Sequence, residues 1–371
     1  MIRTVFGEGT FEQVGTFARQ LAFTRALVVA DPGIVGAGFA GRAGELLAAA
    51  GAQPFLFQDF DANPDTRMVE AGRRFAADND VDGIVALGGG SSLDCAKGIN
   101  FVLTNGGSMR DYRGHGKAAK PMLPSIGIPT TAGTGSEAQS FAIISDAETH
   151  AKMACGDDKA AFRVVILDPL LTVSQPAAVT AVAGYDALSH AVEAYVTKTA
   201  TEQSKAIAAE AWSLLEANYE RVLKEPGDLP ARGAMLKGAN LAGAAIELSM
   251  LGATHACANP LTARYGLTHG VAIAVMLPHV VRWNGEVVGD AYARLLRESG
   301  RVFMDDPAET LAARLEELRS AAGLPASLSE VGVGAGDIPV LAADAAAQWT
   351  GTHNPRPFDA TAARSLYARA L

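Results

Sequence analysis

The segment "GYDALSHAVEAYVT", residues 184–197, places an acid and an imidazole in an otherwise apolar helical pattern. Asp186 and His190 are four residues apart, so they share one face of a predicted amphipathic helix. Its small and apolar neighbours suit packing, and a core helix would ordinarily carry Leu at these two positions. A carboxylate and an imidazole at this spacing can instead supply two metal ligands from one rigid helix.

The segment 252–280, "GATHACANPLTARYGLTHGVAIAVMLPHV", carries three further histidines. His279 follows a proline in an apolar run and lies either near a site or in the core. A single histidine in such small, apolar surroundings is more often a satisfied core residue than a ligand. Together with Asp186 and His190, however, His255 and His269 complete a sensible ligand set for a divalent transition metal. Burying these groups unpaired would be costly, whereas a shared cation satisfies all of them. Three other histidines, His115, His150 and His353, have no such setting and receive no role.

Glycines follow a predicted strand in "GIVALGGGSSLDCAKG", residues 83–98. Glycine lets backbone N–H groups approach phosphate oxygens, and the N-terminus of the following helix favours an anion. The spacing is neither the GxGxxG fingerprint nor a P-loop. A phosphate-binding turn and a purely structural turn both stay open on these residues alone.

A second polar loop, "IPTTAGTGSE" at residues 128–137, carries the hydroxyls of Thr130, Thr131 and Thr134. Two such loops at strand ends favour a nucleotide site, although hydroxyls also cap helices. Asp31 ends another predicted strand. A carboxylate there could bind a ribose diol and would repel a 2′-phosphate, which favours NAD over NADP; a plain turn residue is the alternative.

The pattern of elements divides the chain into two domains. Predicted strands at 26–31, 54–60, 83–90 and from 125 alternate with helices, which indicates a mostly parallel α/β sheet. Short runs at 141–146, 151–155 and 163–169 extend that sheet or form a hairpin. From about 177 onward the pattern is helical, most clearly at 201–225 and 307–323. We place the boundary between 176 and 184, giving domains 1–180 and 181–371.

Composition narrows the class of protein. The chain has 371 residues, 49% of them hydrophobic, and a net charge of -9, which argues against a nucleic-acid binder. Its three cysteines form no CxxC pair, so neither a disulfide framework nor a cysteine zinc site is indicated, and a reducing compartment fits. No run reaches the ~18 apolar residues of a membrane span. We expect a cytoplasmic protein without a membrane partner.

At these motifs the chain resembles the iron-containing (group III) alcohol dehydrogenase family, which is related in fold to dehydroquinate synthase. The resemblance rests on "GGGSSLDCAKGI", "PTTAGTGSE", "ILDPLLT", "GYDALSHAVEAY", "GLTHGVAIAVMLPHV" and the late "NPRP". It implies an α/β dinucleotide-binding domain followed by an all-α metal-binding domain. It also implies Fe²⁺ as the usual metal, with Zn²⁺ or another divalent metal possible, and a homodimer.

By this similarity His255 and His269 take the catalytic role, and Asp186, His190, His255 and His269 bind the metal. The implied NAD contacts are Asp31, Gly89, Gly90, Ser91, Ser92, Asp94, Thr130, Thr131, Thr134, Lys152 and Leu171. The expected reaction is hydride transfer between an alcohol or aldehyde and NAD(H), through an alkoxide bound to the metal. Many relatives carry a histidine where this chain has Asn259, and an amide cannot relay a proton.

Three alternatives remain beside this expectation. A maleylacetate reductase-like enzyme would share the fold, although retention of all four ligands argues against it. A lyase of the dehydroquinate synthase type would lack the matched Asp-x-x-x-His helix. A protein that only senses nucleotides would have no use for the four ligands.

Overall fold

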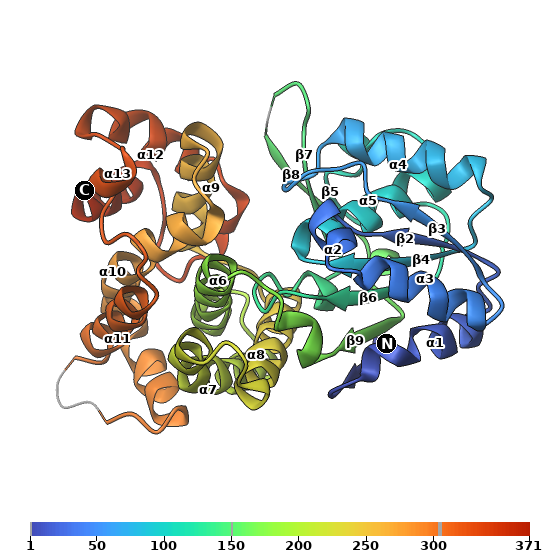
Figure 1. The fold of residues 1–371 in the computed structure, drawn as a ribbon. Coiled ribbons are helices and arrows are strands. Elements are labelled where there is room, and N and C mark those ends of the chain that lie inside the picture. The colour runs from blue at the N-terminus through green and yellow to red at the C-terminus, as the bar shows by residue number, and fades with distance from the viewer. Residues whose placement is uncertain (1, 150, 303–305) are drawn as a thin grey trace. The chain divides into compact units, whose positions relative to one another are not determined.

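The computed structural model describes residues 2–149, 151–302 and 306–371. The chain forms two compact units (Figure 1). Unit 1 comprises Met1–Thr131 and Gly135–Gln175, and unit 2 comprises Ala132–Thr134 and Pro176–Leu371. The three residues 132–134 therefore belong with the helical unit although they lie within the α/β part of the sequence.

Unit 1 is built on a six-stranded parallel sheet with the order β1-β9-β6-β4-β2-β3. Its strands are β1 Arg3–Phe6, β2 Arg25–Val29, β3 Gln53–Phe57, β4 Gly83–Gly88, β6 Ser125–Pro129 and β9 Val164–Leu167. Its helices are α1 Val14–Gln20, α2 Pro32–Gly36, α3 Phe39–Ala49, α4 Thr66–Asp78 and α5 Gly90–Asn105. The predicted parallel α/β fold is confirmed.

The register of the sheet explains its core. Val28 pairs with Val85, Val85 with Ile126, and Ile126 with Val164, so one row of β-branched residues crosses four strands. Because side chains alternate along a strand, this row and its neighbours two residues on lie on the same face. That face packs with residues of α1 and α3 in one hydrophobic cluster.

Three short strands form a separate sheet with the order β5-β8-β7. They are β5 Gly114–His115, β7 Phe141–Ser145 and β8 Lys152–Gly156, and β7 and β8 pair antiparallel. Of the two possibilities for the runs after residue 140, the hairpin applies to the first two, whereas the third, β9, joins the main sheet. Strand β1 was not predicted, because four residues are too few to show a periodicity.

Unit 2 is helical in the residues that the structure describes. Its helices are α6 Ala177–Val196, α7 Glu202–Lys224, α8 Leu229–Leu248, α9 Ala253–Tyr265, α10 His269–Glu298, α11 Pro307–Ala321, α12 Ile338–Ala346 and α13 Ala360–Ala370. Capping signals fix several starts: Thr201 caps α7, and Asp306 before Pro307 caps α11.

Helix α6 differs from the expectation in one respect. Every residue from Gly184 to Val196 is buried, so this part of α6 is enclosed on all sides and is not amphipathic, whereas residues 177–179 are exposed. The small residues of the segment permit this enclosure. For example, a Cβ on Gly184 would lie 2.6 Å from the Tyr219 ring, and one on Gly270 would lie 2.3 Å from the Val182 carbonyl oxygen.

None of the described helices is by itself long and apolar enough to cross a membrane. Only α8 and α9 taken together meet the length and composition criteria, and they are bent by 105° relative to each other.

The approach of α10 to α6 gives a first prediction. Gly270→Ala should lower the unfolding free energy by about 1–3 kcal/mol, because the new methyl group meets backbone that cannot rotate away. Gly289→Ala on the same helix is the matched control. No atom lies within 4 Å of the methyl group added there, so stability should hold or rise slightly. Thermal unfolding measures both; equal melting temperatures for the two variants would contradict this packing argument.

Candidate metal and nucleotide sites

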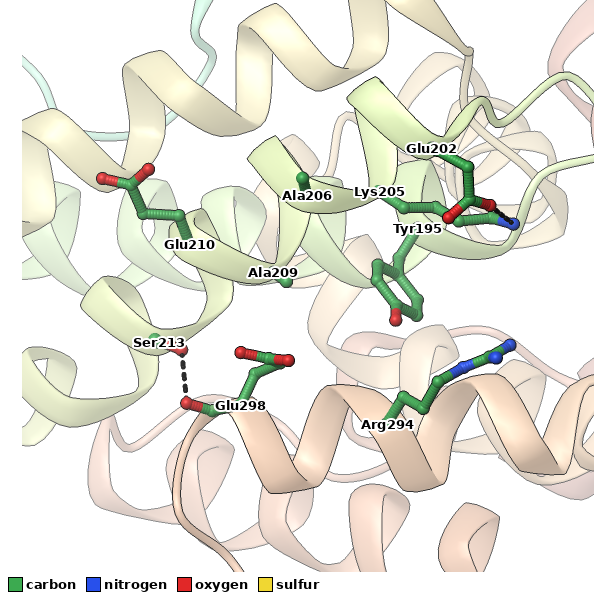
Figure 2. Close-up of a pocket in the computed structure, with 9 residues that line it drawn as sticks. All are labelled: Tyr195, Glu202, Lys205, Ala206, Ala209, Glu210, Ser213, Arg294 and Glu298. Carbon is green, nitrogen blue, oxygen red and sulfur yellow. Dashed lines mark hydrogen bonds and ion pairs between the residues drawn. The ribbon is translucent and has the colours of Figure 1, made fainter.

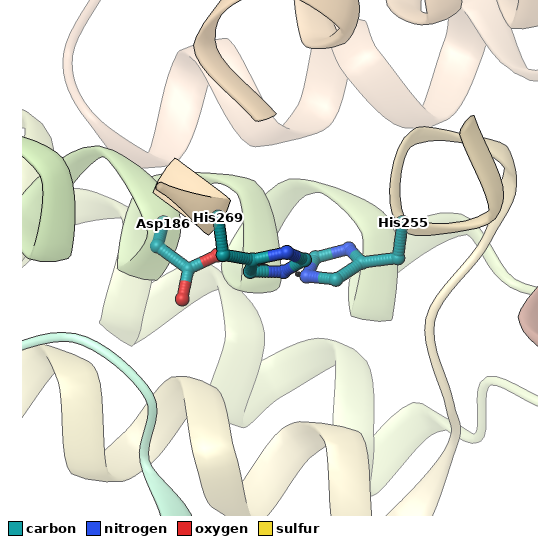
Figure 3. A group of neighbouring side chains, drawn as sticks. All are labelled: Asp186, His255 and His269. Atoms are coloured by element: carbon teal, nitrogen blue, oxygen red, sulfur yellow. Dashed lines mark ion pairs between the residues drawn. The ribbon is translucent and has the colours of Figure 1, made fainter. Parts of the chain in front are cut away.

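Three helices of unit 2 bring the four predicted metal ligands together. Asp186 and His190 lie one turn apart on α6, His255 lies in the first turn of α9, and His269 is the first residue of α10. Figure 3 shows Asp186, His255 and His269 converging from these three helices. The sequence segments are far apart, yet one ligand atom from each of these three residues lies within 4.8 Å of the others.

The carboxylate oxygen Oδ1 of Asp186 is the common centre of the cluster. It lies 3.5 Å from Nε2 of His190, 3.6 Å from Nε2 of His255 and 3.9 Å from Nε2 of His269. The rings are also close, with centroids 5.0 Å apart for His190 and His255. His269 is the most exposed member, with 27% of its side chain accessible, against 5–8% for the other three. The cluster is thus accessible mainly at His269.

These distances fit a shared cation better than hydrogen bonds. Hydrogen bonds between nitrogen and oxygen span about 2.7–3.2 Å, whereas ligand atoms around a tetrahedral ion with bonds of about 2.1 Å lie about 3.4 Å apart. Oδ1 of Asp186 and Nε2 of His255 are buried and make no hydrogen bond. Such orphaned groups are costly, and a divalent ion would satisfy both. The residues therefore fit a metal ion, and three nitrogens with one oxygen suit a transition metal.

Charges within the cluster shift its pKa values. Burial alone would raise the pKa of Asp186, but His190, His255 and His269 hold it well below its usual range. Burial lowers the pKa of His190. For His255 burial also acts downward, but the carboxylates of Asp186 and Glu193 outweigh it and raise the pKa to about 9. In the metal-free state both ring nitrogens of His255 are therefore protonated at neutral pH, and the ring is positively charged.

Glu193 is the functional-site candidate that the sequence analysis missed. It follows His190 by three residues on α6 and is 4% exposed. Its Oε2 lies 2.5 Å from Nδ1 of His255, and its Oε1 accepts a hydrogen bond from the Thr254 N–H at 2.7 Å. The spacing Asp186, His190, Glu193 was available as a signal, because residues at i, i+4 and i+7 share one side of a helix.

Asn259 lies on α9 one turn after His255. Its side-chain amide donates to Oε1 of Gln348 at 3.1 Å. The amide is thus engaged in a hydrogen bond within unit 2. His150 lies outside the described residues.

In unit 1 some of the predicted nucleotide residues lie where the chain reverses direction across the sheet. From β2 the chain runs to β3 on one side, and it then returns to β4 on the other side of β2. In parallel sheets such a switch point leaves a crevice at the carboxyl ends of the two strands, where ligands typically bind. Asp31 follows β2 here, and Gly88 to Gly90 end β4 and begin α5.

The glycine turn after β4 requires glycine for steric reasons. Gly88 has φ of +144°, and a Cβ there would lie 2.4 Å from Oγ of Ser92. Gly89 is the N-cap of the 16-residue helix α5 and provides no side-chain cap. Helix α5 begins at Gly90. The amide N–H groups of its first turn have no side-chain cap, so an anion such as phosphate would be favoured there.

Asp31 already has hydrogen-bond partners within unit 1. Its Oδ1 accepts from the N–H groups of Gly33 and Ile34 at 2.9 and 3.2 Å, which caps α2, and its Oδ2 accepts from Oγ of Ser92 at 3.1 Å. These hydrogen bonds support the alternative that Asp31 is a structural turn residue. Contact with a ribose stays a prediction.

The other predicted NAD contacts occupy varied settings. The hydroxyl of Thr130 is buried without a hydrogen bond, and Oγ of Ser91 accepts from the Asn63 N–H at 3.2 Å. Asp94 lies 3.8 Å from Lys97, which is buried, and burial raises the pKa of Asp94. Leu171 is 3% exposed and belongs to the hydrophobic core of unit 1.

The remaining three predicted contacts divide between the two units. A Cβ on Gly89 would lie 3.4 Å from the side chain of Thr131 in unit 1, whereas Thr134 belongs to unit 2. Lys152 is the first residue of β8.

A separate pocket of about 520 Å³ opens in unit 2 among α6, α7 and α10 (Figure 2). Its lining includes Tyr195, and none of the four candidate metal ligands contributes to it. Two of its carboxylates are already paired with lysines, Glu202 with Lys205 and Glu210 with Lys237. We assign it no role.

A parallel α/β unit with a glycine-rich turn and a helical unit with a histidine–carboxylate cluster are together typical of metal-dependent dehydrogenases. Two family models match the chain: iron-containing alcohol dehydrogenase over residues 2–169, and the Fe-containing alcohol dehydrogenase family C-terminal model over residues 180–371. The chain belongs to the iron-containing alcohol dehydrogenase family.

Similar proteins include an NAD-dependent methanol dehydrogenase from Bacillus methanolicus, 34% identical, with 95% of this chain and 94% of that protein covered. A 1,3-propanediol dehydrogenase from Klebsiella pneumoniae is 34% identical, with 95% and 92% covered. A solved structure of a 1,3-propanediol oxidoreductase has a TM-score of 0.96 at 32% identity and covers 100% of this chain and 98% of its own.

The predicted class is thereby confirmed: the protein is an oxidoreductase of the alcohol dehydrogenase type, in a family with NAD-dependent members. The reductase and lyase alternatives are not favoured.

The pKa of His255 predicts how cation binding depends on pH. Below about pH 9 a cation has to displace the His255 proton, so its apparent affinity should rise about tenfold per pH unit from pH 7 to 9 and then level off. A histidine with the ordinary pKa of 6.5 would level off before pH 7. Zn²⁺ competition with a coloured chelator, corrected for the chelator's own protonation, measures this.

The stability of the metal-free protein should change with pH in the opposite direction to the cation affinity. The folded-state pKa of His255 is raised, so its contribution to stability is complete below pH 6.5 and is lost as the pH rises through about 9. The melting temperature of chelator-treated protein should fall over this range. In the Zn²⁺ competition experiment, a cation affinity that does not change above pH 7 would contradict the protonated state assigned to His255.

Proposed function

We propose that the protein catalyses reversible hydride transfer between a small alcohol and NAD⁺, and in reverse between an aldehyde and NADH, with a divalent metal held by unit 2. The observation that carries this proposal is the convergence of three imidazole nitrogens on one buried carboxylate oxygen at 3.5–3.9 Å. Few structural roles would explain that arrangement, because it leaves buried acceptors without donors.

Asp186, His190, His255 and His269 would hold the metal, with His255 and His269 in the catalytic role as well. A divalent ion bound there supplies Lewis acidity, which lowers the pKa of an alcohol hydroxyl and polarises a carbonyl in the reverse direction. Asp186 offsets one positive charge, and the three neutral imidazoles add none. His269, the most exposed ligand, faces the side from which a substrate hydroxyl can approach. Fe²⁺ is our proposal for the native ion, with Zn²⁺ or another divalent metal able to replace it.

NAD would be bound mainly by unit 1. We propose residues 1–180 as the dinucleotide-binding domain and residues 181–371 as the metal-binding and catalytic domain. The first turn of α5 at Gly89, Gly90, Ser91 and Ser92 would receive phosphate. Asp94, Thr130, Thr131, Thr134, Lys152 and Leu171 complete the proposed set of contacts. The negative charge of Asp31 at the switch point supports NAD over NADP.

The proton released from the alcohol needs an acceptor other than Asn259. The amide of Asn259 has no titratable proton near neutral pH and donates to Gln348. We propose that water or the coenzyme ribose takes the proton.

A small substrate is supported by the relatives named for methanol and 1,3-propanediol. The net charge of -9 supports the absence of a nucleic-acid partner. Three free, buried cysteines support a reducing compartment, and we propose the cytoplasm.

One assay tests the function. Purified protein should reduce NAD⁺ with a panel of small primary alcohols and oxidise NADH with the matching aldehydes, followed by NADH absorbance. Treatment with a chelator should abolish turnover, and Fe²⁺ should restore it. NADP⁺ should give the lower kcat/KM. Full turnover in protein shown by elemental analysis to hold no metal would refute the proposal.

A ligand variant tests the site. His269→Ala should remove most of the bound metal and reduce kcat by at least a hundredfold, while NAD affinity measured by calorimetry stays within about threefold. His353→Ala is the control, since His353 lies elsewhere in unit 2 with Nδ1 3.4 Å from Thr199 Oγ1. Metal content should be normal in that variant. Equal metal content in both variants would exclude His269 as a ligand.

We also propose a homodimer. Strand β1 lies at the edge of the six-stranded sheet, and Phe6 on it is 49% exposed, so this edge can pair with another chain. Sedimentation velocity should give a species of about twice 38.4 kDa. A monomer at micromolar concentration would contradict this.

A further inference from the structure

Glu193 is a buried carboxylate for which the proposed reaction has no direct use. Both of its oxygens contact α9, the helix that carries His255: Oε2 lies 2.5 Å from Nδ1 of His255, and Oε1 accepts from the Thr254 N–H at 2.7 Å. No lysine or arginine is among these partners. A carboxylate that is 4% exposed is costly unless its neighbours donate to it, so these contacts fix its position.

The contact with His255 determines which ring nitrogen is free. An ionised carboxylate only accepts hydrogen bonds, so Nδ1 of His255 has to be the donor. In the neutral ring the lone pair then lies on Nε2, the atom 3.6 Å from Oδ1 of Asp186. Glu193 thus presents to the cluster the nitrogen form that a cation requires.

The same carboxylate also secures the start of α9. Gly252, the N-cap residue, makes no side-chain cap. The Ala253 N–H instead donates to Oδ1 of Asn354 at 3.1 Å, and the Thr254 N–H donates to Glu193. The side chains of Asn354 and Glu193 therefore cap the N-terminus of α9 in place of an N-cap side chain. Glycine is required at position 252, since a Cβ there would lie 2.9 Å from Asn354 Oδ1 and 3.0 Å from Glu193 Oε1.

Asn354, the first residue of "NPRP", is itself held from both sides. Its amide donates to Oδ1 of Asn284 and to the Arg356 carbonyl at 2.9 and 2.8 Å. This late motif therefore acts at a distance from the cluster by anchoring the helix that carries His255.

We propose that Glu193 is a positioning residue of the metal centre, which holds His255 in the Nδ1–H form and directs its Nε2 toward the ion shared with Asp186, His190 and His269. The inference rests on the proposed function, since it presupposes a metal at this cluster. Carboxylates that hold a ligating histidine in this way typically account for 10–100-fold in metal affinity.

Glu193→Gln is the informative variant because it keeps the shape of the side chain. Its amide oxygen can still accept from the Thr254 N–H, which leaves the NH₂ group opposite Nδ1 of His255. Nδ1 then becomes an acceptor, and the ring proton moves to Nε2, where it blocks metal binding. Glu216→Gln is the matched control: Glu216 is equally buried in unit 2, but it accepts hydrogen bonds from Arg301 and Arg314.

Metal-free protein is titrated with Co²⁺ and followed by its visible absorption. We expect Glu193→Gln to bind 10–100-fold more weakly than wild type with altered bands, and Glu216→Gln to bind within twofold of wild type. Failure of the wild type to bind Co²⁺ would overturn both the proposed function and this inference. Wild-type affinity and bands in Glu193→Gln would overturn this inference alone.

A second measurement needs no substitution. In zinc-loaded wild-type protein with ¹⁵N-labelled histidine, His255 should appear as an Nδ1–H form whose proton resonates far downfield because of the short contact with Glu193. A zinc-bound Nδ1 of His255, or a ring proton on its Nε2, would overturn the proposal even if Glu193→Gln did not fold.

Discussion

The oxygen Oδ1 of Asp186, with three imidazole nitrogens at 3.5–3.9 Å, is the constraint on which the helical unit depends. No hydrogen bond relieves it. An isolated buried ion costs several kcal/mol, which is a substantial part of the 5–15 kcal/mol that stabilises a typical domain. The neighbouring imidazoles offset this cost, since they hold the pKa of Asp186 well below its usual range. The surrounding packing therefore has to keep these groups together. Accordingly α6 is enclosed on every side from Gly184 to Val196, and glycine recurs where another backbone or ring touches it.

The candidate site of unit 1 differs from that of unit 2, because it is formed mainly by backbone atoms. The parallel order brings the ends of β2 and β4 together, and the left-handed Gly88 leaves room for the side chain of Ser92. Ser92 in turn donates to Asp31 across the two strand ends. One hydroxyl thus connects the glycine turn to the carboxylate that caps α2, which makes the turn rigid before any ligand arrives.

Much of this could be predicted from local patterns. Short apolar runs located β2, β3, β4 and β6, and the Asp-x-x-x-His spacing located the helix at the centre of unit 2. Three features were not predicted. Strand β1 is too short for periodicity and exists because β9 offers it a partner. Enclosure of α6 depends on neighbours that small residues allow to approach. Glu193 shares one side of its helix with Asp186 and His190, but its hydrogen-bond partners are 61 and 62 residues distant in the sequence. Without the position of α9, it is indistinguishable from a solvent-exposed helix residue.

The position of Glu193 outside the ligand set bears on the chemistry. A divalent ion with Asp186 as its one anionic ligand would carry a net charge of +1, which favours ionisation of a nearby hydroxyl. A second carboxylate in direct contact with the ion would remove that charge and weaken its Lewis acidity. From Nδ1 of His255, Glu193 instead acts through the ring: it increases the basicity of Nε2 and strengthens the hold on the ion. Glu193 can therefore set the affinity for the metal ion, while Asp186 separately sets the Lewis acidity of that ion.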